Sequence, residues 1–246
     1  MNALEGKVEH IPEKPKRTFM TKIMPNIQII KKGEFCYIVE SGNRLIRYKP
    51  WLGDGFSFLY DFIMRNSVFP RKFGGDIQKH YDTLAQHLAG IHGKHILELG
   101  TGSGSAVHFL NKDNHYTGTD VSPGLLKQAA KRFIKSGFPA PEFYVTSADD
   151  LPFKKSIFDI CLCILSLNFI GNVEKVFQEV GRVLLPDGVF FCSVPVPERN
   201  RVQSTIRGVL YSETELEKIC QAHGFTFERI PCENGALVYF KAEKKG

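Results

Sequence analysis

The most regular pattern in the chain begins near residue 76, where Ile77, Tyr81, Leu84 and Leu88 recur at the spacing of one helix face. The next apolar run, 95–99, is short and lies between glycines, which is typical of a strand buried on both faces of a parallel sheet. From there the pattern alternates between strands and amphipathic helices. This alternation predicts an α/β fold with a doubly wound, mostly parallel sheet.

Local signals place the remaining elements of this sheet. The last two strands are separated only by residues 231–235, which is too short for a helical crossover, so we expect them to pair antiparallel. The expected fold is a seven-stranded, mostly parallel sheet with an antiparallel last strand, whose ligand lies beyond the carboxyl ends of the first strands. The further expected strands are 116–119, 143–145, 158–165, 189–194, 225–230 and 236–241, and the further helices begin at Ser103, Ser122, Asn172 and Ser212.

The residues before 76 are less regular. Two β-prone runs at 26–30 and 35–39 predict a small hairpin, and apolar residues at helical spacing predict a helix over about 56–66. We expect residues 1–75 to form an N-terminal extension that covers the substrate, and residues 76–246 to form the main domain.

Charge is concentrated at the front of the chain, which carries most of the net charge of +6. Residues 1–50 hold ten Lys or Arg against five Glu, or 10 − 5 = +5. This segment is compatible with peripheral contact with an anionic membrane surface. The charges are spread as on a solvated face, and without a clustered patch they argue against a nucleic acid partner.

Two further features bear on class and location. No apolar run approaches the roughly 20 residues needed to cross a bilayer, and the start of the chain lacks a signal-peptide stretch, so we expect a cytoplasmic protein. The six cysteines are scattered without metal-ligand spacing, so we expect no metal site and reduced thiols in the core. Cys161 and Cys163 should lie on one side of a strand.

The strongest local motif joins the first strand of the main domain to its helix, from Glu98 through Gly100 and Gly102 to Gly104. Glycines permit positive φ and let a ligand approach the backbone, and a helix start offers free N–H groups. The dinucleotide fingerprint requires a glycine at position 105, where this chain has Ser105. We expect the Glu98 carboxylate, at the mouth of the loop, to favour an ammonium group over a pyrophosphate, which indicates a cofactor that carries an amino acid.

A second carboxylate complements the loop. Asp120 ends the next strand, twenty residues after Gly100. A carboxylate at this place can accept hydrogen bonds from both hydroxyls of a ribose. Loop and aspartate together predict a nucleoside site.

These residues resemble the class I S-adenosylmethionine-dependent methyltransferases, over roughly residues 76–246. Residues 98–104 resemble the first motif of that family, Asp120 its ribose-binding acid, 149–153 its adenine-side loop, and 184–188 the turn before its fifth strand. The resemblance implies S-adenosyl-L-methionine as cofactor. The residues it assigns to cofactor binding are Glu98, Gly100, Thr101, Gly102, Gly104, Asp120, Val121, Ala148 and Asp149.

Within this class the chain is most similar to the ubiquinone/menaquinone biosynthesis C-methyltransferase type, which has a Tyr-Asp pair in a preceding helix, as Tyr60-Asp61 here. Tyr60 is then expected to close over the methionine end of the cofactor, although an aromatic at helical spacing also suits the core. One departure concerns Ser147, which stands where these families usually have an acid or Asn before Ala148. Ser147, Asp149 or the backbone alone could therefore hold the adenine amino group.

The acceptor side is less defined. Asn168 follows the fourth strand, where that strand should meet the methyl group, and is the candidate catalytic residue; a helix-entry cap is the alternative. His80, His87 and His92 suit solvated or core positions better than a site. Loop 195–209 and the aromatics of the front segment favour an apolar or anionic acceptor; these aromatics are Phe19, Tyr48, Trp51, Phe56 and Phe58.

The expected function is methyl transfer from S-adenosylmethionine to a small-molecule or lipid-like acceptor. Carbon, nitrogen and oxygen stay open as the methylated atom, as does the oligomeric state. Two alternatives remain: a nicotinamide-dependent oxidoreductase, and a protein that binds S-adenosylmethionine without catalysis. Binding of S-adenosylmethionine but not of NAD would exclude the nicotinamide-dependent oxidoreductase.

Overall fold

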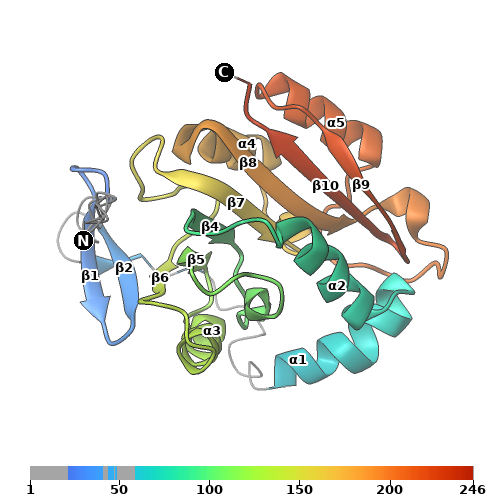
Figure 1. Ribbon diagram of the computed structural model, residues 1–246, viewed down its shortest axis with the longest axis horizontal. Helices are drawn as coiled ribbons and strands as arrows, with labels where there is room; N and C mark the ends of the chain where they lie inside the picture. Colours follow the sequence, from blue (N-terminus) through green and yellow to red (C-terminus); the bar gives the residue numbers. More distant parts are fainter. Residues whose placement is uncertain (1–21, 41–43, 47, 49–58, 246) are drawn as a thin grey trace, which may run out of the picture.

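The computed structural model describes residues 22–40, 44–46, 48 and 59–245. In this part of the chain a single ten-stranded sheet has the order β1-β2-β6-β5-β4-β7-β8-β10-β9, with β3 paired to β2, and helices lie against both faces (Figure 1). The strands are β1 (Gln28–Lys32), β2 (Phe35–Glu40), β3 (Arg44–Leu45), β4 (His95–Leu99), β5 (His115–Asp120), β6 (Glu142–Val145), β7 (Phe158–Ile164), β8 (Leu184–Pro195), β9 (Glu228–Asn234) and β10 (Leu237–Glu243).

The seven strands β4–β10 form the sheet expected from the sequence. β6, β5, β4, β7 and β8 run parallel to their neighbours, as in the pairing of Leu97 with Thr117 and with Cys161. β10 pairs antiparallel with both β8 and β9. The mostly parallel sheet with a reversed last strand is therefore confirmed.

The hairpin near the front of the chain extends this same sheet, which is larger than expected. β1 and β2 pair antiparallel, and β2 pairs parallel with β6, where Phe35 lies opposite Phe143. Without this pairing β6 would be an edge strand with unpaired backbone groups. Pairing also buries Cys36 and Ile38. The domain division at residue 75 stays a prediction, although the described strands before it continue the main sheet.

The four long helices begin where their capping residues predict. Asp76, Ser122 and Asn172 each accept a hydrogen bond from the backbone N–H three residues later, at 2.7, 3.1 and 3.0 Å. Ser212 and Glu215 form the expected capping box. The helices are α2 (Ile77–Leu88), α3 (Pro123–Lys135), α4 (Val173–Val183) and α5 (Glu213–Ala222).

The prediction of a helix from Ser103 is wrong, because only a 3₁₀ turn, η4 (Ser105–His108), follows the glycines. Asn111 and Asn114 supply the physical reason. Their side-chain amides donate to the carbonyls of Ala89 and Ile91, at 2.8 and 2.9 Å. Side chains that bond to backbone groups in this way compete with helix formation.

The helix expected over 56–66 extends further toward the C-terminus than expected. Residues 56–58 lie outside the described residues; α1 (Tyr60–Ile63) continues as a π-helix, η3 (Met64–Phe73), which runs through Pro70. Proline usually ends a helix, so the local sequence indicates an earlier stop. Packing outweighs it: Phe69 and Phe73 are buried, with ring centroids 5.5 Å apart in an edge-to-face contact.

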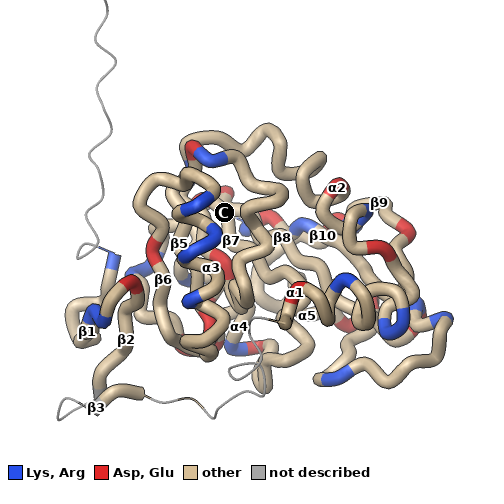
Figure 2. Tube along the Cα trace, turned by 90° about the horizontal axis from the view of Figure 1, so that it is seen from below, with Lys and Arg blue, Asp and Glu red and all other residues tan. Residues whose placement is uncertain are grey.

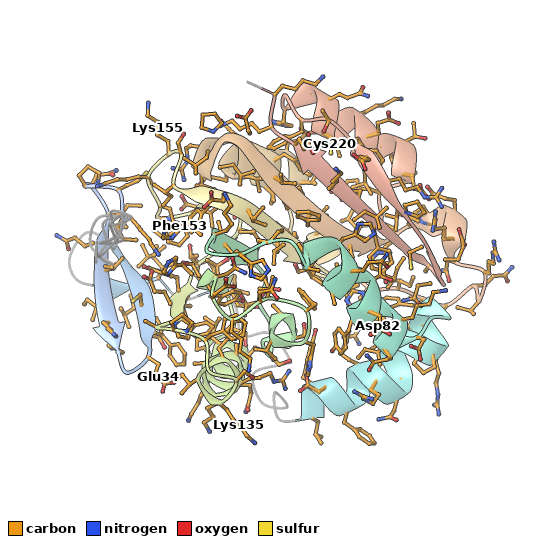
Figure 3. All side chains as sticks on the ribbon, viewed as in Figure 1. Glu34, Asp82, Lys135, Phe153, Lys155 and Cys220 are labelled. Carbon is orange, nitrogen blue, oxygen red and sulfur yellow. The ribbon has the colours of Figure 1, made fainter. Side chains whose placement is uncertain are left out.

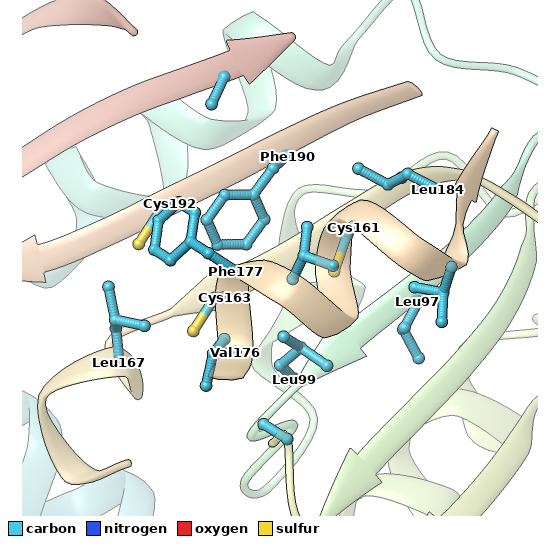
Figure 4. Packing of buried hydrophobic residues seen from close by; sticks show 14 of the residues in the cluster. Leu97, Leu99, Cys161, Cys163, Leu167, Val176, Phe177, Leu184, Phe190 and Cys192 are labelled. Atoms are coloured by element: carbon cyan, nitrogen blue, oxygen red, sulfur yellow. The ribbon is translucent and has the colours of Figure 1, made fainter. Parts of the chain in front are cut away.

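The core lies in two clusters of apolar side chains. Cys161 and Cys163 both point into one of them, beside Phe177 and Phe190, as expected (Figure 4). Burial raises the pKa of the Cys161 thiol well above its ordinary value. All six cysteines are free, and only Cys232 among them is partly exposed. No described helix is long and apolar enough to cross a membrane.

Charges on the described surface are mixed. Lys and Arg are distributed over many elements with acidic positions between them (Figure 2). The expectation of spread charge concerned residues 1–50, most of which lie outside the described residues. Several of these side chains pair, such as Lys94 with Asp159 and Lys241 with Glu228.

Candidate functional site

The turn after β4 requires glycine at the positions where the backbone is most crowded. Gly100 and Gly104 have φ of +65° and +83°, in the left-handed region that favours glycine. A β-carbon on Gly100 would lie 2.5 Å from Cβ of Ser166, and one on Gly104 would lie 2.8 Å from Cα of Ala129. The turn therefore packs directly against the end of β7 and against α3.

Asp120 connects this turn to the end of β5. One carboxylate oxygen accepts the backbone N–H of Gly102 at 2.8 Å, and the other accepts that of Ser122 at 2.9 Å. The structure thus brings together the glycine turn and the aspartate, which the sequence placed at neighbouring strand ends.

Glu98 lies beneath the turn, and not at its mouth as expected. It is 1% exposed and accepts a hydrogen bond from the Tyr116 hydroxyl. The same hydroxyl lies 3.1 Å from Oγ1 of Thr101, which is also buried. Burial raises the pKa of the Glu98 carboxyl to about 8. Contacts of Glu98 and Thr101 with a cofactor stay predictions; Tyr116 was not foreseen as their partner.

The adenine-side loop lies beyond the end of β6. Ser147 donates a hydrogen bond to Asp149, so these two candidates act as a pair. Ala148 is buried, and Phe153, labelled in Figure 3, anchors the loop in the core with no exposed surface. On the neighbouring strand end, Val121 is 36% exposed. Asp149 and Val121 therefore keep part of their surface open, as ligand contacts require.

Tyr60 lies over the glycine turn. A β-carbon on Gly102 would lie 4.0 Å from the Tyr60 hydroxyl. Burial, together with the nearby carboxylates of Asp120 and Asp61, raises the pKa of Tyr60 above its ordinary value. A role for Tyr60 toward the cofactor stays a prediction, and its position is compatible with that role.

Asp61 fastens α1 to the turn. It accepts a hydrogen bond from Oγ of Ser103 at 2.6 Å and forms an ion pair with Arg132 on α3. Ser103 and Arg132 were not foreseen. The Tyr60-Asp61 pair was the sequence signal that pointed to this contact, but its partners become visible only when three distant segments meet.

A cavity of about 650 Å³ adjoins Tyr60. Its walls come from α1 and η3, from residues 165–169 after β7, and from residues 205–207. Ligand sites typically have volumes of about 300–1,000 Å³. The cavity is thus large enough for a small organic molecule, and it lies next to the glycine turn.

Asn168 lines this cavity but also has a structural bond. It is 2% exposed, and its amide Nδ2 donates to the carbonyl of Arg207 at 2.7 Å. Its Oδ1 has no hydrogen-bond partner in the described part of the chain. Asn168 lies inside the 3₁₀ turn η5 (Leu167–Phe169), so it caps no helix. A catalytic role for Asn168 stays a prediction.

The histidines lie apart from this site, as expected. His80 is buried, its Nδ1 is 2.9 Å from the Tyr239 hydroxyl, and burial lowers its pKa to about 3. His87 is exposed, and His92 is an exposed partner of Asp113. Among the described residues no group of His, Cys, Asp and Glu could hold a metal ion.

Comparisons with known proteins agree with this geometry. Residues 97–192 match a family model described as a methyltransferase domain. A fatty-acid O-methyltransferase of Mycolicibacterium smegmatis is 33% identical over 117 residues, 46% of this chain and 41% of that protein. The ubiquinone/menaquinone biosynthesis C-methyltransferase UbiE of Rickettsia massiliae is 33% identical over 106 residues, 40% of this chain and 43% of that protein. The matches thus span less than half the length of these relatives.

Solved structures share the fold over more of the chain. An S-adenosylmethionine-dependent methyltransferase of Clostridium acetobutylicum aligns with a TM-score of 0.62 at 17% identity, covering 78% of this chain and 99% of that one. A chain from the complex of the Haloferax volcanii Trm112 methyltransferase activator with a putative methyltransferase gives 0.64 at 18% identity, covering 81% and 100%. Residues 97–192 thus match a methyltransferase domain, and the sheet around them has the fold of solved S-adenosylmethionine-dependent methyltransferases.

Proposed function

We propose that this chain transfers the methyl group of S-adenosylmethionine to a small-molecule or lipid-like acceptor. The observation that carries the proposal is that Tyr60 lines the cavity and also contacts the glycine turn, which Asp120 ties to the following strand. The relatives named above, a fatty-acid O-methyltransferase and a ubiquinone/menaquinone biosynthesis C-methyltransferase, support an acceptor of this kind.

The residues present fit the cofactor. At Gly102 the backbone of the turn stays accessible: an added β-carbon would come no closer than 4.0 Å to Tyr60. Asp120 stands at a strand end where a carboxylate can accept hydrogen bonds from ribose hydroxyls. Ser147 and Asp149 lie where an adenine amino group would be bound. Glu98 is buried against Tyr116 with a raised pKa, so the geometry does not carry its contact with the ammonium group, which stays a prediction.

When bound, the cofactor supplies an electrophilic methyl group on a sulfonium leaving group. A bound cofactor would thus supply both the methyl group and the leaving group, and an acceptor atom that starts neutral would lose a proton. The protein has to align the acceptor with the methyl group and exclude water. We assign the alignment of the acceptor to Tyr60 and Asn168, both of which line the cavity.

Calorimetric titration of the full chain tests this function. We expect heat of binding with S-adenosylmethionine and with its demethylated product, and none with NAD. Asp120→Asn should weaken cofactor binding by about 10- to 100-fold, because the loss of charge weakens each hydrogen bond that the side chain accepts. Asp159→Asn, on the opposite end of the sheet strands, is the matched control. Binding of NAD alone would refute the proposal.

A further inference from the structure

The cavity is apolar over most of its wall. Met64, Val68 and Phe73 contribute from η3, Leu165 from the end of β7, and Ile206 from the opposite loop. Burying apolar surface of a ligand against apolar walls contributes roughly 25 cal/mol of binding free energy per Å² removed from water. The body of a ligand that fills this space is therefore apolar.

The charged residues that line the cavity have one sign. Within the described part of the chain they are Lys72 and Arg207, and no acidic residue lines it. Neither forms an ion pair with another described residue, whereas Asp61, the acid next to Tyr60, is already paired with Arg132. A negative group that enters the cavity therefore meets two cations and no carboxylate in its wall.

The backbone segments that carry the two cations are held in place by hydrogen bonds. The Lys72 carbonyl accepts a hydrogen bond from Oγ of Ser204, and the Arg207 carbonyl accepts from the Asn168 amide at 2.7 Å. The loop that carries Arg207 is thus fastened both to η3 and to the end of β7. Both backbones are fixed, while the long side chains stay exposed and can reach a ligand.

Lys72 is remote from the methyl donor. It lies 12 residues after Tyr60 in the continuous run of α1 and η3 (72 − 60 = 12), which is on the order of 15 Å along the helix. Tyr60 is the end of this run that contacts the glycine turn. An anion bound by Lys72 is therefore separated from the reacting methyl group by much of the cavity.

We propose that the acceptor is an amphiphilic anion whose apolar body fills the cavity and whose anionic group binds Lys72 and Arg207, so that a different atom of the acceptor receives the methyl group. This inference rests on the proposed function and adds the substrate class. Lys72 and Arg207 are then specificity-determining residues, and Met64, Val68 and Phe73 form the apolar wall.

Calorimetry with the full chain, saturated with the demethylated cofactor product, tests the inference. The probes are dodecanoate and dodecan-1-ol, both below their aggregation limits. Dodecanoate should bind at least about 10-fold more tightly than the alcohol, since hydrogen bonds to charged groups contribute about 1.5–3 kcal/mol. Lys72→Gln and Arg207→Gln should each weaken dodecanoate binding by about 3- to 10-fold, and the double variant should bind both probes equally.

Lys155→Gln is the matched control, because Lys155 lies far from α1 and η3 (Figure 3). Equal binding of the two probes to the unaltered chain, or equal affinity of the Lys72, Arg207 and Lys155 variants for dodecanoate, would overturn the inference. Formation of methyl dodecanoate with S-adenosylmethionine would also contradict it, because the anionic group itself would then be methylated. Cofactor binding without dodecanoate binding refutes this inference alone; dodecanoate binding without cofactor binding refutes only the proposed function.

Discussion

The two halves of the site are built in different ways. The cofactor side, which we define as the glycine turn, Asp120 and residues 147–149, follows directly from strand ends. Its contacts include backbone N–H groups that donate to a side chain, such as Gly102 to Asp120. The acceptor side, defined as the walls of the cavity, joins 60–73, 165–169 and 205–207, which are far apart in sequence. One half is specified locally, and the other depends on packing between distant segments.

The largest effect is expected on the cofactor side, for Gly100→Ala. A β-carbon there adds a clash with Ser166 to the cost of a left-handed backbone. We expect a loss of about 2–5 kcal/mol in the free energy of unfolding, from about 1–2 for the backbone and 1–3 for overpacking, measured by urea denaturation. Cofactor binding should become undetectable by calorimetry.

Gly33→Ala is the control for this variant. Gly33 has a similar φ of +63°, but no atom lies within 4 Å of its added β-carbon. It should lose only the backbone contribution of about 1–2 kcal/mol and keep its cofactor affinity. If both variants behaved alike, the close packing of the turn against β7 would not be what requires glycine.

The next effect concerns the buried carboxyl beneath the turn. Burial raises the pKa of Glu98 from an ordinary value of 4.5 to about 8, so the folded state holds this proton more tightly than the unfolded chain. The stability this contributes is complete below about pH 4.5 and is lost as pH rises through about 8. Glu98→Gln should therefore stay within about 1 kcal/mol of the unaltered chain at pH 5 and exceed it by about 4 kcal/mol at pH 8.5.

Urea denaturation of both proteins at pH 5, 7 and 8.5 measures this difference. Gln keeps the shape of the protonated carboxyl and can accept the Tyr116 hydroxyl. A constant difference between the two proteins across this range would show that Glu98 titrates in the folded state as it does in the unfolded chain.

The smallest effect is expected on the acceptor side, for Asn168→Ala. The variant loses the bond to the Arg207 carbonyl, which should cost about 1–2 kcal/mol in the free energy of unfolding. Amide hydrogen exchange at Val209, whose N–H donates to the Asn168 carbonyl, should become faster, while cofactor affinity stays within about twofold.

Asn172→Ala, which removes the cap of α4, is matched in residue type and should cost a similar amount without changing exchange at Val209. Exchange at Val209 that did not respond to Asn168→Ala would mean that this side chain does not hold the loop. A fall in cofactor affinity with Asn168→Ala would show that the two halves are coupled.

Prediction from sequence succeeded where the residues that decide a feature lie within one short segment. The caps of α3 and α5, the buried cysteines of β7 and the parallel pairing of the central strands are such cases. It failed where a distant contact decided the outcome. The helix after Gly104 was lost to hydrogen bonds from Asn111 and Asn114, and η3 continued through Pro70 because Phe69 and Phe73 pack in the core.

The sequence by itself determined the sheet and the cofactor side, since glycines at a strand end and a carboxylate at the next are set by backbone geometry and spacing. Only the tertiary structure decided that Glu98 is buried against Tyr116, that β2 extends the sheet past β6, and that Lys72 and Arg207 share a cavity. These outcomes depend on which distant surfaces meet and exclude water, and no local pattern of residues specifies that.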